Sequence, residues 1–362
     1  MLFIDGDHIL SQEGTTQGDP LAMAMYAIGT LPLIHKLQGN VTQVWYADDA
    51  SAGGQTSDLH LWWDSLVSCG PHFGYNPNPC KTWLVVKPEH LPAAEEHFQG
   101  SGVNITTQGH RHLGAPLGSK SFVEEFVRDK ISCWGSEIKR LSEIAKFQPQ
   151  VAYAVFTHAL TNRWTFLMWT VPGTDHRLQP LEEAIQHQFL PAVTGRQGIT
   201  DLEGDLLALP ALDGGLGVLI PTRNANNQFK ACTEVTAPLV ELIRRWNPNY
   251  PKLSQLKQRQ TKFALRIRNQ RETNKEAELL KPKLSGAGQR AMEQASEKGA
   301  SAWLTAIPMS KYGFNLHKQA FRDALCLWFS WTPARLPTYC PCGQTFSVSH
   351  AFSCLKGAMP SI

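Results

Sequence analysis

The stretch Gln43 to Gly53 constrains the fold more than any other part of this sequence. A strand-forming run, Val44 to Tyr46, leads into two adjacent aspartates, and a short run of small residues leads away. This pattern predicts a β-hairpin with Asp48 and Asp49 at its tip. Neighbouring residues on a regular strand point to opposite faces, so consecutive acids can face one ion only where the backbone turns. Carboxylate oxygens suit Mg²⁺, which also binds phosphates, so the hairpin is a candidate for phosphoryl chemistry.

Three motifs in and around this hairpin resemble the palm domain of reverse transcriptases. Tyr46–Asp49 reads Tyr-Ala-Asp-Asp, which is similar to the catalytic signature of that family. Upstream, Gln12–Leu21 ends in Gln-Gly-Asp-Pro-Leu, similar to the element that opens a palm helix. Downstream, Gly74–Thr82 resembles the turn that carries the lysine of the family. Order and spacing agree for all three motifs, whereas Asp-Asp alone also fits an ordinary solvated turn.

The resemblance implies roles for individual residues. It implies that Asp48 and Asp49 bind Mg²⁺ and that Gln17, Gly18 and Tyr46 contact the incoming deoxynucleoside triphosphate and template base. It also assigns a catalytic role to Lys81.

Lys81 and the turn at Leu113 and Gly114 complete the set of palm-like residues. The resemblance places Lys81 near the triphosphate, where a cation offsets leaving-group charge and can donate a proton. An exposed lysine at a strand start is the alternative. Val103–Ser119 resembles the hairpin that grips the primer phosphates, with its Leu-Gly turn at the tip. His110 and His112 on this hairpin are interpreted as surface or strand residues.

Composition indicates a folded protein with two or three domains and an intracellular setting. The chain has 362 residues, 42% of them hydrophobic, and its eight cysteines are mostly far apart. No charged, apolar export signal opens the chain. The longest apolar run, Leu21 to Ile34, is shorter than the ~20 residues a bilayer needs and contains Pro32. It predicts a buried helix and no membrane partner, and leaves nuclear and cytoplasmic locations open.

Charge is unevenly distributed although the net charge is only +3. Residues 1–120 hold 5 Lys or Arg against 11 Asp or Glu, whereas 244–283 hold 12 against 3. The basic segment predicts a long helix, Lys252–Leu280, that contacts a polyanion; a solvated helix face is the alternative. The cations expected to contact nucleic acid are Lys257, Arg259, Lys262 and Arg266.

The pattern predicts an α+β fold, in which a partial palm of antiparallel sheet and packed helices precedes helical segments. Apolar spacing predicts helices at 20–34, 57–73, 121–141, 151–169 and 181–189, the last three resembling the thumb of the family. Ser121 and Glu124 have the spacing of a capping box. The expected segments are a partial palm at 1–119, a thumb-like domain at 120–200, a connecting region with the basic helix at 201–281, a linker at 282–290 and a helical segment with a Cys/His tail at 291–362.

The tail carries four metal-type ligands at short spacing. Cys340, Cys342, His350 and Cys354 follow a C-x-C-x₇-H-x₃-C pattern. Three sulfurs and one imidazole suit tetrahedral Zn²⁺, and Gly343 permits the tight turn of a zinc knuckle. A single residue between the first two cysteines is less usual for zinc, so reduced, unpaired cysteines are the alternative. Retroelement proteins similar to this one often end in such a cluster.

The hypothesis from sequence is therefore a reverse-transcriptase-like fragment of a retrotransposon, of the kind without terminal repeats. The implied ancestor is an RNA-directed DNA polymerase, a nucleotidyltransferase using two metal ions, an RNA template and a DNA primer or RNA–DNA hybrid. The fingers and the strand with the third catalytic carboxylate are expected upstream of the Gln-Gly-Asp-Pro element, where only 13 residues precede Gly14. We therefore expect no polymerisation by this chain alone. The alternative is a nucleic-acid-binding remnant of a transposable element; a metal-dependent nuclease ranks third.

Overall fold

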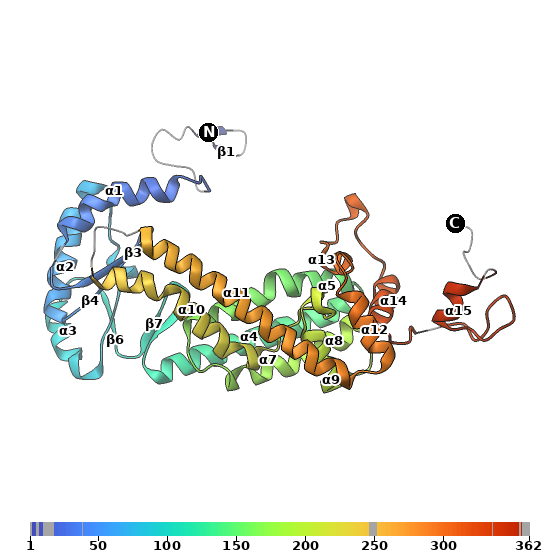
Figure 1. Cartoon of the computed structure of the whole chain (residues 1–362). Coiled ribbons are helices and arrows are strands. Elements are labelled where there is room, and N and C mark those ends of the chain that lie inside the picture. The colour runs from blue at the N-terminus through green and yellow to red at the C-terminus, as the bar shows by residue number, and fades with distance from the viewer. Residues whose placement is uncertain are drawn as a thin grey trace. The chain divides into compact units, whose positions relative to one another are not determined.

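The structure is a computed structural model that describes residues 2–4, 7–9, 18–37, 39–245, 252–334, 336–354 and 356. Figure 1 shows the helices and strands of the chain, which contacts divide into two compact units. Unit 1 comprises Met1–Glu125 and Leu239–Tyr250, and unit 2 comprises Phe126–Pro238 and Pro251–Ile362. These boundaries differ from the five expected segments. Helices combine with short sheets, so the α+β class is confirmed. No helix in the described part of the chain is both long and apolar enough to span a bilayer.

Short strand pairs, not one continuous sheet, make up the β-structure that is described in unit 1. The antiparallel pairs are β1 (Leu2–Ile4) with β2 (Asp7–Ile9), β3 (Thr42–Tyr46) with β4 (Asp49–Gly53) and β7 (Gly109–His112) with β8 (Ala115–Gly118); β5 (Trp83–Val85) pairs with β6 (Asn104–Thr106) in parallel. The predicted hairpin at 43–53 is confirmed. Of the stretch Val103–Ser119, expected as a second hairpin, Gly109–Gly118 forms one, whereas Asn104–Thr106 pairs in parallel with β5. The expected antiparallel palm sheet is not formed by the described strands. Pro116 lacks the N–H that would extend pairing from β8.

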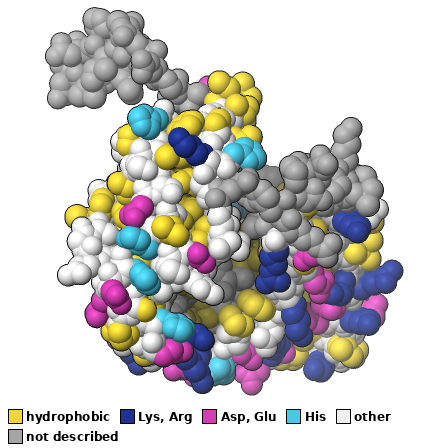
Figure 2. All heavy atoms as spheres, turned by 90° about the vertical axis from the view of Figure 1, so that its left-hand side faces the viewer, with side chains coloured by type: hydrophobic (Ala, Val, Ile, Leu, Met, Phe, Trp, Pro, Cys, Tyr) yellow, Lys and Arg dark blue, Asp and Glu magenta, His cyan; other side chains and the backbone are white. Residues whose placement is uncertain are grey.

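Three helices accompany these strands: α1 (Ala22–Lys36), α2 (Thr56–Cys69) and α3 (Leu91–His97). The prediction that α1 is buried is wrong. Leu33 is fully buried, whereas Leu21, Met23 and Ile28 are 67%, 55% and 68% exposed. Figure 2 shows hydrophobic side chains on the surface around α1, at the top of that view. Only the C-terminal part of α1 reaches the core, because apolar composition alone does not supply a surface to pack against.

The core of unit 1 gathers around a buried amide. Leu33, Leu37, Trp63, Leu66 and Phe98 form the buried cluster. At its edge lies the side chain of Gln43, which is itself buried.

Gln43 connects three elements through its side-chain amide. Its Nε2 donates to the Ile34 carbonyl at 3.1 Å, in α1. Its Oε1 accepts from the indole N–H of Trp45 in β3, at 3.1 Å, and of Trp62 in α2, at 3.2 Å. A buried polar group that is paired in this way stabilises one arrangement, because any other leaves it unsatisfied. The β3–β4 hairpin is therefore fixed at its base to both helices.

Unit 2 is a helical assembly. Its helices are α4 (Lys120–Ala145) beyond residue 125, α5 (Pro149–Val155), α6 (Thr161–Thr170), α7 (Gln179–Ala184), α8 (Leu190–Thr194), α9 (Asp201–Ala208), α10 (Pro221–Arg245) up to residue 238, α11 (Lys252–Leu280), α12 (Gly286–Ala295), α13 (Ala302–Thr305), α14 (Lys318–Trp328) and α15 (Val348–Ser353). Two π-helical turns, Phe156–Leu160 and Ile185–Phe189, join α5 to α6 and α7 to α8. The rings of Phe156 and Phe189 stack between them, with centroids 4.3 Å apart.

Two local expectations for the helices are corrected. Helix α4 is capped by Ser119, whose Oγ accepts from the Phe122 backbone N–H at 3.2 Å, and not by Ser121. Residues 282–290, expected as a linker, belong to unit 2 and include the first part of α12. The neighbouring Leu280 and Ala291 are buried.

The Gly-rich loop after α9 has a packing role. Leu216 is buried, and its carbonyl accepts a 2.6 Å hydrogen bond from the Tyr153 hydroxyl of α5. The Gly214 carbonyl accepts from the indole N–H of Trp328 in α14. Gly215 lies so close to the Leu209 carbonyl that no side chain fits there. Burial raises the pKa of Tyr153 to about 12, so its hydroxyl remains a donor at neutral pH.

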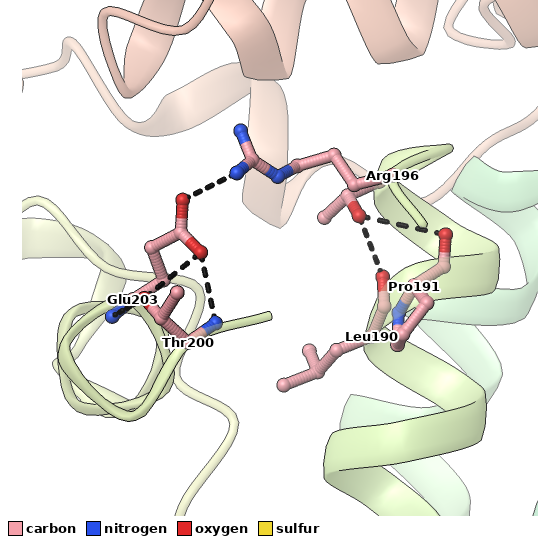
Figure 3. A network of polar contacts seen from close by, with 6 residues as sticks. Leu190, Pro191, Arg196, Thr200 and Glu203 are labelled. Carbon is pink, nitrogen blue, oxygen red and sulfur yellow. Dashed lines mark hydrogen bonds and ion pairs between the residues drawn. The ribbon is translucent and has the colours of Figure 1, made fainter. Parts of the chain in front are cut away.

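A capping box fixes the start of α9 (Figure 3). The Thr200 hydroxyl accepts from the Glu203 backbone N–H, and the Glu203 carboxylate accepts from the Thr200 backbone N–H. Arg196 donates to the same carboxylate at 2.6 Å. Its guanidinium also lies 4.3 Å from the centre of the Trp331 ring. These contacts link α9 to the segment after α14.

Replacing Gln43 by Leu tests whether the buried amide holds unit 1 together. The change leaves two indole N–H groups and one carbonyl unpaired in the core, so we expect the free energy of unfolding to fall by about 3 kcal/mol. Urea unfolding followed by tryptophan fluorescence measures it. The control is Gln55→Leu, an exposed position without a side-chain capping bond. Equal stability of the two variants would contradict this account of the core.

Candidate functional site

One cleft in unit 1 brings together residues from several of the sequence motifs. It has a volume of about 1010 Å³, at the upper end of the roughly 300–1,000 Å³ of ligand pockets. Its lining includes Asp48, Asp49, Lys81 and Leu113. Among the described residues, Asp48 and Asp49 are the only carboxylates that line the cleft. The lining also holds Lys81 and Arg111, so the cleft offers carboxylates for a cation and cations for an anion.

The two aspartates lie at a tight turn. Tyr46 pairs with Asp49 in the β3–β4 ladder, so Ala47 and Asp48 alone form the loop. Ala47 has a φ of +51°, the left-handed conformation that two-residue hairpin loops require. Both aspartates are exposed, and neither forms an ion pair within the described part of the chain. Such a turn can direct two adjacent carboxylates at one divalent cation.

Tyr75 holds the tip of this hairpin. Its hydroxyl donates to the Asp48 backbone carbonyl at 2.8 Å. Its ring packs edge-on against Trp45, with the ring centroids 5.1 Å apart. Burial is the largest cause of the raised pKa of Tyr75, and the Asp48 and Asp49 carboxylates add to it. The phenol therefore stays protonated and remains a donor. Tyr26 of α1 also lines the cleft, and burial followed by Asp48 raises its pKa.

Lys81 ends a 3₁₀ turn, Pro79–Lys81, which is followed by Thr82 and then by β5. The backbone of this turn is tied to β6 because the Asn104 amide donates to the Cys80 and Thr82 carbonyls at 3.0 and 3.1 Å. The Lys81 side chain is exposed and has no ion-pair partner among the described residues. A fixed backbone with a free ammonium suits binding of a phosphate group in the cleft.

The β7–β8 hairpin supplies another wall of the cleft. Its loop is Leu113-Gly114, with φ values of +46° and +89°, and Leu113 lines the cleft. His110 stacks on Trp83 with ring centroids 4.3 Å apart. His112 Nε2 lies 3.3 Å from Ser51 Oγ in β4. The two histidines, interpreted from sequence as ordinary strand residues, thus connect this hairpin to β5 and to the aspartate hairpin.

Of the remaining predicted substrate contacts, the two that the structure describes do not line the cleft. Gln17 lies outside the described residues. Gly18 and Tyr46 are described and exposed, but they are not among the residues that line the cleft. Sequence reasoning missed Tyr75 and His112, because their contacts join positions far apart in the chain. The alternation of His110 and His112 on one strand was the available signal for a shared face.

The basic helix α11 of unit 2 carries its cations on two faces. Lys257, Arg259, Lys262 and Arg266, predicted to contact nucleic acid, are all exposed. At 3.6 residues per turn, Arg259, Lys262 and Arg266 share one face, whereas Lys257 lies on another.

The Lys257 face of α11 contains further cations that the sequence reading did not single out. They are Arg268, Arg271 and Lys275, which line a hollow of about 450 Å³. Arg268 also pairs with Glu234 of α10 at 3.4 Å. The side of α11 between the two basic faces carries the buried Leu265. The helix therefore packs through that side, and both basic faces remain accessible.

Cys340, Cys342, His350 and Cys354 form a compact cluster in unit 2. Their ligand atoms all lie within 4.8 Å of one another. The Cys340 and Cys354 sulfurs are 3.6 Å apart, and Cys342 Sγ is 3.1 Å from His350 Nε2. Two sulfurs bound to tetrahedral zinc are about 3.8 Å apart, given Zn–S bonds of about 2.3 Å. The donor set and its spacing fit such an ion, so this cluster could hold a metal such as zinc.

Local hydrogen bonds hold the four ligands in place. The Cys340 N–H donates to the Gln344 carbonyl and the Gly343 N–H donates to the Cys340 carbonyl, both at 2.8 Å. Gly343 adopts a φ of +91°, which favours glycine. Ser347 caps α15 by accepting from the His350 N–H at 3.0 Å. A tight turn and a capped helix therefore present the ligands to one point.

Comparisons of the chain with protein-family models, curated proteins and solved structures found no match.

Metal analysis tests the Cys/His cluster. We expect the purified chain to carry about one zinc ion per molecule, measured by mass spectrometry, because the sulfur and imidazole donors surround a single point. Cys342→Ser and His350→Ala should each reduce the zinc content to a small fraction. Cys133→Ser, an exposed cysteine outside the cluster, is the matched control. Zinc content that is equal in all variants would show that the cluster does not bind the ion.

Proposed function

We propose that the cleft of unit 1 binds a magnesium-bound deoxynucleoside triphosphate and that the chain is a reverse-transcriptase-like protein. The observation that carries the proposal is that Asp48, Asp49 and Lys81 line one cleft of about 1010 Å³. Asp48 and Asp49 come from one motif and Lys81 from another, more than thirty positions later in the sequence. A pair of carboxylates and a separate cation are the groups that a metal–triphosphate complex requires.

Each of these residues has a distinct chemical role in the proposal. Asp48 and Asp49 hold the divalent cation, which when bound neutralises charge on the phosphates and aligns the reacting oxygens. Lys81 binds the departing phosphates and offsets the charge that develops on them. Tyr75 positions the aspartate turn through its hydrogen bond to the Asp48 carbonyl. In the proposal, the Leu113-Gly114 turn contacts the phosphates of a primer strand that is paired with an RNA template.

Two carboxylates limit what this cleft can catalyse. Clamping both the attacking and the departing oxygen requires two metal ions and a larger set of carboxylates. Within the described residues the cleft offers Asp48 and Asp49. The proposal is therefore binding of the nucleotide without polymerisation by this chain alone.

The second candidate is a nucleic-acid-binding protein without catalysis. It is supported by the exposed cations of α11, which occupy two faces of the helix. In that case the aspartates have no ligand, and oligonucleotide binding depends on α11 and on salt concentration.

Nucleotide titration distinguishes the two candidates. We expect a fluorescent deoxynucleoside triphosphate to bind in Mn²⁺ or Mg²⁺, because the metal bridges its phosphates to the aspartates. Asp48→Asn with Asp49→Asn should weaken binding at least tenfold, since both metal ligands lose their charge. Lys81→Ala should weaken it less, because the metal contact remains.

Matched substitutions serve as controls for the titration. Asp64→Asn removes an exposed carboxylate of α2 and Lys87→Ala an exposed lysine, and neither residue lines the cleft. Both should bind nucleotide as the parent chain does. Metal-independent nucleotide binding, or binding unaffected by the paired aspartate change, would favour the second candidate. Efficient primer extension on an RNA template would contradict the limit set by two carboxylates.

A further inference from the structure

The loop between α13 and α14 has an unusual surface. Figure 1 shows the segment between these helices projecting from them, and we name residues 306–317 the Tyr312 loop. Its exposed large apolar side chains are those of Ile307, Met309, Tyr312, Phe314 and Leu316. These five exposed side chains lie within twelve residues of the loop. Large exposed apolar patches often mark interaction sites.

The loop is held in a defined shape from within unit 2. Gln150, in the first turn of α5, is buried, and its amide bonds the loop backbone twice. Its Nε2 donates to the Phe314 carbonyl at 3.0 Å, and its Oε1 accepts from the Leu316 N–H at 2.6 Å. Gly313 allows the sharp turn between the two rings, with a φ of +70°. The aromatic side chains are therefore presented by a fixed backbone.

Lysines lie over the aromatic rings of this surface. Lys311 Nζ is 5.6 Å from the centre of the Tyr312 ring, and Lys318 Nζ is 5.8 Å from the centre of the Phe147 ring. Phe147, just before α5, is 74% exposed. The rings of Tyr312 and Phe314 are 5.9 Å apart. A lysine therefore accompanies an aromatic ring both in the Tyr312 loop and at Phe147.

The charge of this surface favours a polyanion. Residues 299–322 contain Lys311, Lys318 and Arg322 and no Asp or Glu. Arg322 is used internally, where it donates to the Ala145 and Ala192 carbonyls, which leaves the two lysines for a ligand. Single-stranded nucleic acid is recognised by aromatic side chains that stack on bases, beside cations that contact phosphates. An apolar protein partner would not need a cation beside each ring.

We propose that the Tyr312 loop together with Phe147 binds single-stranded nucleic acid, with bases stacked on Tyr312 and Phe314 and phosphates on Lys311 and Lys318. This surface shares no residue with the cleft of unit 1 or with the basic helix α11. It adds a contact for unpaired bases, which cations on α11 alone do not recognise. It does not depend on the function proposed for the cleft.

Binding of labelled single-stranded oligothymidine and of a duplex to the full chain, followed by fluorescence anisotropy, tests the proposal. Tyr312→Ala with Phe314→Ala should weaken single-strand binding about tenfold or more, since each stacked base contributes substantially. Duplex binding should not change, because paired bases are not available for stacking. The salt dependence should keep its slope, since no phosphate contact is removed. Tyr312→Phe should retain full affinity, and Phe166→Ala, an exposed ring on α6, should behave as the parent chain.

The same titration is repeated in a chain with Arg259, Lys262 and Arg266 changed to Gln, which removes one basic face of α11. There the effect of the paired Tyr312 and Phe314 change should persist. Photocrosslinking with bromouracil-substituted oligonucleotide should label the Tyr312 peptide. Single-strand affinity that is unchanged in the paired variant would overturn the proposal. Self-association that is lost in this variant while oligonucleotide binding persists would assign the loop to a second copy of the chain and also overturn it.

Discussion

The arrangement of unit 1 depends on the hydrogen bonds of one buried amide. Gln43 sits between α1, β3 and α2, and its side chain satisfies one carbonyl and two indole N–H groups. Because an unpaired polar group in the core is costly, these elements are fixed relative to one another. Tyr75 then secures the opposite end of the hairpin at the Asp48 carbonyl. The carboxylates are thus presented by a short hairpin held at both base and tip, which is the precision that a metal site requires.

The two candidate metal sites differ in how the fold brings their residues together. The Cys340 to Cys354 cluster is built within fifteen residues by a turn and a capped helix, so its geometry is local. The cleft instead assembles residues 26 to 117 from several hairpins and helices. Short strand pairs are sufficient to build the cleft, because each pair needs to place only a few side chains along its wall. The cleft of unit 1 is consequently more sensitive to changes in the core than the cysteine cluster.

The features that were predicted from the sequence are those formed by residues close to one another in the chain. Strand and turn preferences predicted the hairpin at 43–53, but they placed Asp48 and Asp49 at its tip, where the structure has Ala47 and Asp48. The Leu113-Gly114 turn was expected only from the family resemblance, and the Cys340 cluster follows from ligand spacing. Tertiary contacts were not predictable in this way. Tyr75 reaches Asp48 across 27 positions and His112 reaches Ser51 across 61, and no periodicity encodes such pairs. The apolar run of α1 predicted burial, yet periodicity cannot state whether a covering surface exists.

The central claim is that the aspartate hairpin and Lys81 bind opposite ends of one metal–triphosphate complex. Anomalous diffraction from crystals grown with Mn²⁺ and a deoxynucleoside triphosphate tests it most directly, since the metal and the phosphates are located independently. The account predicts a manganese peak between Asp48 and Asp49, with the triphosphate extending towards Lys81 in the same cleft. A manganese peak elsewhere in the molecule, with the cleft of unit 1 empty, would contradict it.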